Sequence, residues 1–162
     1  MNQQLHKENQ RLKKDLDRRH FPDNKNIPFL EIIPQMVSYT NRNLIYEYVN
    51  NSYEHHFQIK AQDIVGKSLK EIIGEKVLKK AKAHIEKVLT GQEVKYIERF
   101  EYPGGKVKYI EGHLIPDTTV SDDVRGYWAI LDDITDKKVA EHHLQRNEEK
   151  FRSLYENAPL PY

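Results

Sequence analysis

Histidine is the residue type in this sequence best suited to metal or cofactor chemistry, because its ring nitrogens bind metals and titrate near neutral pH. Two adjacent pairs occur, His55-His56 and His142-His143, each preceded by a glutamate. Neighbouring residues on a helix point about 100° apart, so neither pair is arranged to hold one metal ion without ligands from elsewhere. We predict that both pairs are surface residues and that there is no metal site.

Motifs for nucleophilic catalysis or phosphoryl transfer are missing from the sequence. The sequence has no cysteine, which removes disulfides, thiolate catalysis and cysteine-ligated zinc or iron–sulfur sites. It has no glycine-rich phosphate loop, phosphoacceptor histidine box, nucleotide-cyclase signature or plausible pair of nucleophile and base. The chain itself is therefore not expected to be an enzyme.

Length and charge limit the possible partners. The chain has 162 residues, with 26 lysines and arginines against 25 aspartates and glutamates. That length suits one compact core, and the near balance of charge gives no reason to expect nucleic acid or an anionic membrane as a partner. No apolar run is long enough for a signal peptide or a membrane span, so we expect a cytoplasmic location without direct membrane contact.

The elements that must position any site follow two patterns. Short runs rich in β-branched and aromatic residues predict strands at 36–40, 44–49, 93–102, 106–116 and 124–134. Amphipathic patterns predict helices at 50–58, 68–74 and 75–91. Ser68 and Glu71 have the spacing of a capping box at the start of the second helix. This order indicates an α+β fold, a five-stranded antiparallel sheet with helices on one face.

Alternation along the third strand places one carboxylate on the buried face. Tyr96, Phe100 and Tyr102 share a face with Glu98 in the strand at 93–102. A carboxylate that faces a core must find a partner, stay near the rim or take up a proton. Glu98 is therefore a candidate polar group of any site between the sheet and the helices.

A helix is predicted before the first strand. Within residues 1–26, Leu5, Leu12 and Arg19 are spaced seven apart, and Asn9 and Leu16 lie on the adjoining seam. The pattern is typical of a short parallel coiled coil, and a solvated helix tail fits it equally well.

A second heptad helix follows the last strand directly. Thr135 or Asp136 is expected to cap its start, since both side chains accept hydrogen bonds from a helix N-terminus. Its seam consists of Ala140, Leu144, Asn147, Phe151 and Leu154.

Several short motifs occur in an order typical of one family. Asn50 opens a helix after the second strand, Gln62 to Lys67 form an IVGK turn, and the last strand has Gly126 early and Asp133-Ile134-Thr135 at its end. Over about residues 29–135 the sequence resembles the PAS sensory domains of bacterial and archaeal signalling proteins. This resemblance implies the strand order 2-1-5-4-3, a pocket for a small molecule or cofactor, and a homodimer formed through flanking helices.

The resemblance also limits the cofactor. PAS domains that form a covalent flavin adduct or attach a coumaroyl chromophore need a cysteine, so the absence of cysteine excludes both, while noncovalent flavin stays open. Haem-binding members place a histidine on the long helix. Here the matching position is Ala81, and His84 lies at the edge of the apolar stripe, so haem is not expected.

The same alignment predicts which side chains line the pocket. The candidates are Phe57, Leu78, Ile85, Tyr96, Glu98, Phe100, Ile110, Leu114, Ala129 and Leu131. A filled core that holds no ligand remains the alternative, because the PAS fold does not by itself imply a ligand.

The resemblance implies a function in signal relay. Asp133, Ile134 and Thr135 join the last strand to the C-terminal helix, so a shift in the sheet is expected to reach that helix. We predict a sensory module of a multidomain signalling protein such as a sensor histidine kinase. The alternative is a ligand-free dimerisation and relay module of a diguanylate cyclase, a phosphodiesterase or a transcriptional regulator.

The domain boundaries follow from these patterns. We predict a helical segment at 1–26, a PAS domain at 27–135, a helical linker at 136–150 and the start of a second PAS domain at 151–162. The last assignment depends on Leu154, Glu156 and Pro159, which are spaced much like Leu30, Glu31 and Pro34. Output domains are expected in the rest of the parent chain.

Overall fold

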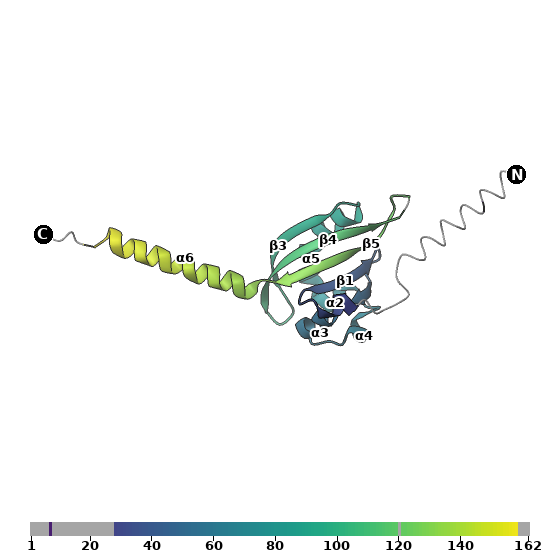
Figure 1. Ribbon diagram of the computed structural model, residues 1–162, viewed down its shortest axis with the longest axis horizontal. Helices are drawn as coiled ribbons and strands as arrows, with labels where there is room; N and C mark the ends of the chain where they lie inside the picture. Colours follow the sequence, from purple (N-terminus) through teal and green to yellow (C-terminus); the bar gives the residue numbers. More distant parts are fainter. Residues whose placement is uncertain (1–6, 8–27, 120, 159–162) are drawn as a thin grey trace.

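A computed structural model describes residues 7, 28–119 and 121–158, and it has a sheet domain from which one long helix projects (Figure 1). The strands are β1 (Met36–Asn41), β2 (Tyr46–Val49), β3 (Val94–Glu101), β4 (Val107–Thr118) and β5 (Val124–Asp133). The helices are α2 (Pro28–Ile32), α3 (Asn51–Phe57), α4 (Ala61–Ile64), α5 (Leu69–Leu89) and α6 (Thr135–Glu156). The predicted segment 1–26 lies outside the described residues, apart from residue 7. In the part of the chain that the structure describes, no helix is long and apolar enough to span a membrane.

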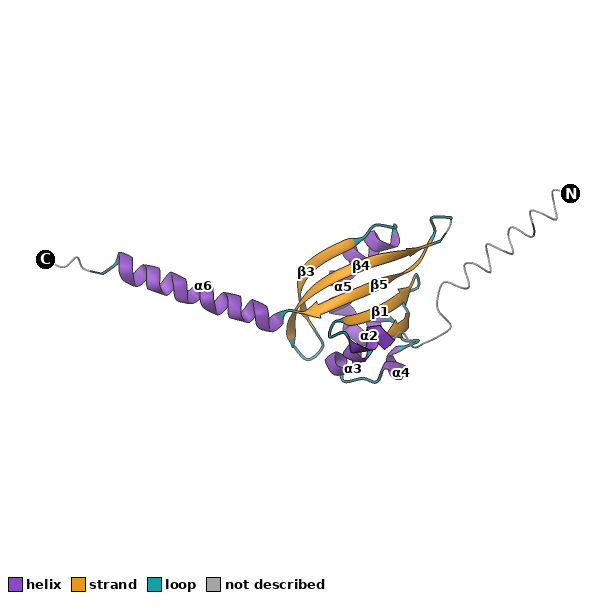
Figure 2. Cartoon of the chain, viewed as in Figure 1, coloured by secondary structure: helices purple, strands orange, loops and turns teal. Residues whose placement is uncertain are grey.

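The five strands form one antiparallel sheet in the order β2-β1-β5-β4-β3 (Figure 2). This order confirms both the predicted α+β class and the topology implied by the resemblance. The first and last strands of the sequence are neighbours in the sheet, with Ser38 of β1 opposite Ala129 of β5. A helix that follows β5 therefore begins beside the strands at the centre of the sheet.

Helix α5 covers one face of the sheet together with α3 and α4. Its start is the predicted capping box: the Ser68 hydroxyl accepts a hydrogen bond from the Glu71 amide at 3.3 Å, and the Glu71 carboxylate accepts one from the Ser68 amide at 2.8 Å. Gly74 has φ 81° and ψ 162°, which interrupts the helix where the sequence predicted two separate helices. The buried side of the longer part, which includes Val77, Ala81, Ile85 and Val88, packs on the sheet.

The helices that the sequence predicted between β2 and β3 lie on one face of the sheet, but the short helix α2, which it did not predict, lies on the other. Leu30 and Ile33, from α2 and the residue after it, pack against the opposite face. There they join Val37, Tyr39, Tyr48, Trp128 and Ile130 in a second, smaller core. Proline-rich residues around α2 gave no helical periodicity, which is why the sequence did not predict this short helix.

Asn50 holds α2, β1 and α3 together. Its side chain is completely buried, its Oδ1 accepts a hydrogen bond from the Val37 amide at 2.9 Å, and its Nδ2 donates to the carbonyls of Leu30 at 2.8 Å and Gln35 at 2.9 Å. The residue occupies the N-cap position of α3, as predicted, but its side chain makes no capping bond there. Asn50 instead fixes the chain that enters the first strand.

Helix α6 differs from the prediction at its start. Ile134 is the N-cap, and neither Thr135 nor Asp136 caps the helix with its side chain, because Thr135 is already the first helical residue and its hydroxyl bonds elsewhere. The helix continues without interruption to Glu156, so the predicted boundary at 151 lies inside it. Pro159, on which a second domain depended, lies outside the described residues.

Candidate ligand cavity and strand-to-helix junction

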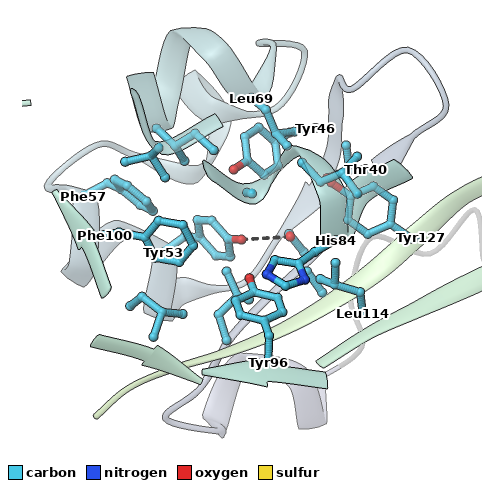
Figure 3. A pocket seen from close by; sticks show the side chains of 18 of the residues that line it. Thr40, Tyr46, Tyr53, Phe57, Leu69, His84, Tyr96, Phe100, Leu114 and Tyr127 are labelled. Carbon is cyan, nitrogen blue, oxygen red and sulfur yellow. Dashed lines mark hydrogen bonds between the residues drawn. The ribbon is translucent and has the colours of Figure 1, made fainter. Parts of the chain in front are cut away.

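A cavity of about 60 Å³ lies between the sheet and the helices α3 and α5 (Figure 3). Predicted residues that line it are Phe57, Ile85, Tyr96, Phe100, Ile110, Leu114, Ala129 and Leu131. They come from one short helix, the long helix and three strands, and they meet because the buried faces of those elements converge. The structure thus brings most of the predicted pocket together.

Two predicted pocket residues lie elsewhere. Leu78 lines a groove on the outer side of α5 with Leu44 and Leu89, because Val77 and Ala81 are the residues that α5 turns towards the cavity. Glu98 remains at the rim with its side chain 31% exposed, and its carboxylate lies 2.9 Å from the Lys80 ammonium. The hydrogen bond from Lys80 lowers the pKa of Glu98, so this carboxylate is a paired surface anion.

Sequence reasoning missed a set of hydroxyl groups around the cavity. They belong to Ser38, Thr40, Tyr46, Tyr53 and Tyr127. The hydroxyl of Tyr102, a residue that alternation had already placed on the buried face, lies with them. Alternation in β1 puts Ser38 and Thr40 on the same face, and this pattern could have identified them as small polar residues of the inner surface. Tyr46 and Tyr53 gave no such signal, because their role depends on how α3 folds over the sheet.

The hydroxyl of Tyr53 is bonded inside the cavity wall. It donates to the Ser38 hydroxyl at 2.8 Å, drawn as the dashed line in Figure 3, and both residues are almost completely buried. Burial raises the pKa of Tyr53 to about 12, although its bonds to Ser38 and Tyr46 oppose that effect. Burial also raises the pKa of Tyr46 and Tyr127, so all three phenols stay neutral at physiological pH.

His84 and Tyr96 close the cavity on the β3 side. Their rings are stacked with centroids 4.3 Å apart and planes 9° from parallel, and they lie beside each other in Figure 3. The His84 Nε2 atom lies 3.7 Å from the Glu98 carboxylate, so the imidazole connects the cavity wall to the charged rim. Tyr96 also lies across Gly112, where a Cβ atom would come within 2.2 Å of its ring.

The predicted relay residues are fixed to β4. The Thr135 hydroxyl accepts a hydrogen bond from the Tyr109 amide at 3.0 Å and donates to the Asp133 carboxylate, while the Ile134 amide donates to the Tyr109 carbonyl at 2.9 Å. Ile134 is buried. Only one residue separates β5 from α6, so a displacement of β4 or β5 acts directly on the first turn of the helix.

His56 links this junction to α3, contrary to the prediction of a surface residue. Its side chain is 8% exposed, and its Nδ1 lies 3.1 Å from the Lys108 ammonium, which itself lies 2.9 Å from the Asp133 carboxylate. Burial, helped by the charge of Lys108, lowers the pKa of His56 to about 4. Burial raises the pKa of Asp133, but hydrogen bonds from Thr135 and Lys108 outweigh it and hold that pKa below normal. The neighbouring His55 is exposed.

Comparison with known families settles the class of the domain. The PAS fold family matches residues 30–139, which include the whole sheet, the cavity and the junction. The chain belongs to the PAS fold family. A second PAS domain is not evident from this comparison. A search of curated proteins finds no match to the sequence.

Solved PAS structures share the fold at low sequence identity. A PAS domain from Colwellia psychrerythraea is 14% identical with a TM-score of 0.59, and the match covers 67% of this chain and 93% of that one. The PAS domain of BvgS from Bordetella pertussis is 14% identical with a TM-score of 0.51, over 75% and 93% of the two chains. VqmA from Vibrio cholerae, solved with ligand and DNA, is 20% identical with a TM-score of 0.58, over 68% and 50%.

This chain spans only part of some of these proteins. The match covers 37% of an RNA-binding light-oxygen-voltage receptor, and half of VqmA. The family match over residues 30–139 fits a sensory or regulatory PAS domain.

Proposed function

We propose that this chain is the sensory and relay module of a multidomain signalling protein of the sensor histidine kinase class. In this proposal a small molecule occupies the cavity, the sheet shifts, and the shift reaches α6 through Asp133, Ile134 and Thr135. The observation that carries the proposal is the junction itself, where β5 passes into α6 across one residue while both are hydrogen-bonded to β4. Catalysis belongs to output domains of the parent chain.

A homodimer in the cytoplasm completes the proposed mechanism. Leu144, Phe151 and Leu154 are 62%, 65% and 70% exposed on α6, and they repeat at heptad spacing. An exposed apolar seam on a helix is stabilised by packing against a second helix, and the helix of a second chain presents the same seam. A change in the pitch or rotation of this helix pair is then the output signal.

A ligand-free relay module is the second candidate. It is favoured by the small volume of the cavity, about 60 Å³, because a core that side chains fill almost completely leaves only small voids of this kind. In that case the domain passes on rearrangements of a dimer within a diguanylate cyclase, a phosphodiesterase or a transcriptional regulator.

One measurement separates the two candidates. The purified chain is denatured, and the extract is examined for small molecules by mass spectrometry. A stoichiometric compound supports sensing, whereas an empty extract from a stable dimer supports the ligand-free relay.

A second experiment tests the relay in both candidates. One alanine is inserted after Thr135 in a fusion of this chain to the catalytic region of a histidine kinase, and autophosphorylation is measured. We expect the insertion to change kinase output, because it rotates α6 by about 100° relative to the sheet. A control insertion after Ser121, in the turn between β4 and β5, is expected to leave output unchanged. Equal output from both insertions would contradict the relay.

A further inference from the structure

The polar groups of the cavity have a spare hydrogen-bond donor. The Tyr53 hydroxyl donates a hydrogen bond to the Ser38 hydroxyl at 2.8 Å. A pair of hydroxyl groups has two protons and one hydrogen bond between them, so one proton is left to donate elsewhere. No carbonyl or carboxylate of the described residues accepts that proton, and burying a donor without a partner is costly. An acceptor atom on a bound molecule would satisfy it.

The walls offer no counterion for a charged ligand. No aspartate, glutamate, lysine or arginine lines the cavity. The tyrosines are neutral because burial raises their pKa, and the His84 imidazole is already directed towards Glu98 at the rim. A carboxylate or ammonium in this space would lose its hydration without an ion partner, which strongly disfavours its binding.

The volume sets an upper limit on size. A space of 60 Å³ holds about four separate water molecules, given that one water needs about 15 Å³, and about four to six atoms of one molecule, because bonded atoms overlap. Tyr96 occupies what would otherwise be a recess over Gly112, and the stacked His84 holds its ring there. Neither a flavin nor a haem fits this space without displacement of those rings.

From these three features we infer the chemical class of the ligand: a compact, uncharged molecule with a carbonyl-type or ring-nitrogen acceptor, of about four to six non-hydrogen atoms. Its acceptor atom binds the spare hydroxyl proton of the Ser38–Tyr53 pair, and its apolar body contacts side chains such as Ile110 and Ala129. This inference rests on the proposed sensing function, and it names the kind of molecule that the same cavity takes.

Amide NMR of the complete chain tests the class with three probes. Propionamide is compact and uncharged, propionate has the same shape with a negative charge, and benzamide carries a larger ring. We expect millimolar propionamide to shift the backbone amides of cavity residues such as Ser38 and Ala129. Propionate and benzamide at the same concentrations are expected to leave those amides unchanged.

Two single-hydroxyl variants test the anchor. Ser38→Ala is expected to weaken propionamide binding by about fivefold or more, which corresponds to the loss of one hydrogen bond. Tyr48→Phe is the matched control, because it removes a buried hydroxyl that bonds to Glu31 on the other face of the sheet. Propionamide should bind this control as it binds the unchanged chain.

The outcomes separate this inference from the proposed function. Binding of propionate or benzamide at the cavity, or an equal effect of the two variants, would overturn the ligand class and leave sensing intact. Absence of propionamide binding would also overturn the class, and co-purification of another compound would then still support sensing. The insertion after Thr135 reports on the relay independently of any ligand.

Discussion

At the scale of single residues, buried polar side chains do most to define this domain. Asn50, Tyr53 and His56 lie close together in the sequence, but their side chains contact different parts of the fold. Asn50 bonds to the chain that enters β1, Tyr53 bonds to Ser38 in the cavity wall, and His56 lies beside Asp133 at the junction with α6. Hydrogen bonds between buried groups are specific, since a lost partner leaves an unpaired atom in a low-dielectric interior. Substitutions of these residues are therefore expected to have specific effects on stability.

Replacement of Asn50 should be strongly destabilising. Asn50→Ala leaves one amide and two carbonyls without their partner, so we expect a loss of about 3 kcal/mol or more in the free energy of unfolding. Asn51→Ala is the control, because the exposed side chain next to it makes none of these bonds. Urea denaturation of the two variants measures the difference, and equal midpoints would contradict the role of Asn50.

The buried His56 predicts a pH dependence of stability. The pKa of His56 is about 4 in the folded chain and about 6.5 in the unfolded chain. Between these two pH values His56 is therefore protonated in the unfolded chain and neutral in the folded chain. Stability should therefore fall as the pH drops from about 6.5 to 4, by on the order of 2 kcal/mol, and this contribution is constant above that window.

Urea titrations at several pH values measure this slope. His56→Gln should flatten it, since the glutamine does not titrate. His55→Gln, which changes the exposed neighbour, should keep it. A slope in His56→Gln as steep as in the unchanged chain would show that another group causes the pH dependence.

At the scale of elements, local sequence patterns predicted the strands and the longer helices correctly, whereas features that depend on tertiary contacts were missed. The five strands, their order and the capping box of α5 follow from alternation, turn residues and motif order, because each is a local property of the sequence. Local patterns also placed Tyr96, Phe100 and Ile110 on the buried face. Local patterns wrongly placed Leu78 in the pocket, because the apolar stripe of a helix is wider than the part of it that borders a cavity. They also wrongly placed His56 on the surface, because its burial depends on how α3 packs against β4.

The exposed seam of α6 carries a prediction for assembly. Leu144→Lys should weaken the proposed dimer by about tenfold or more, since it puts a charge in the apolar seam. Gln145→Lys adds the same charge one position away, outside the seam, and should leave the dimer intact. Sedimentation equilibrium measures both dissociation constants. Equal constants would mean that α6 is not the dimer contact.

At the scale of the whole molecule, the sheet connects the cavity to α6, since β4 and β5 both line the cavity and both contact the start of α6. The cavity lies between the sheet and the helices α3 and α5. Helix α6 projects from the end of β5 (Figure 1). A sheet of packed strands deforms little, so a change in cavity filling is expected to move the strands together and to alter the first turn of α6. The proposed mechanism therefore depends on coupling between the cavity and α6.

The most direct test changes the filling of the cavity and measures α6. Because the chain has no native cysteine, Glu149→Cys gives one spin label on each α6 of the dimer, and electron paramagnetic resonance gives their separation. Ala81→Val adds two methyl groups on the cavity side of α5, and Ala83→Val adds the same groups at an exposed position of that helix. We predict that Ala81→Val shifts the distance distribution and that Ala83→Val does not. Identical distributions in both folded, dimeric variants would contradict the coupling.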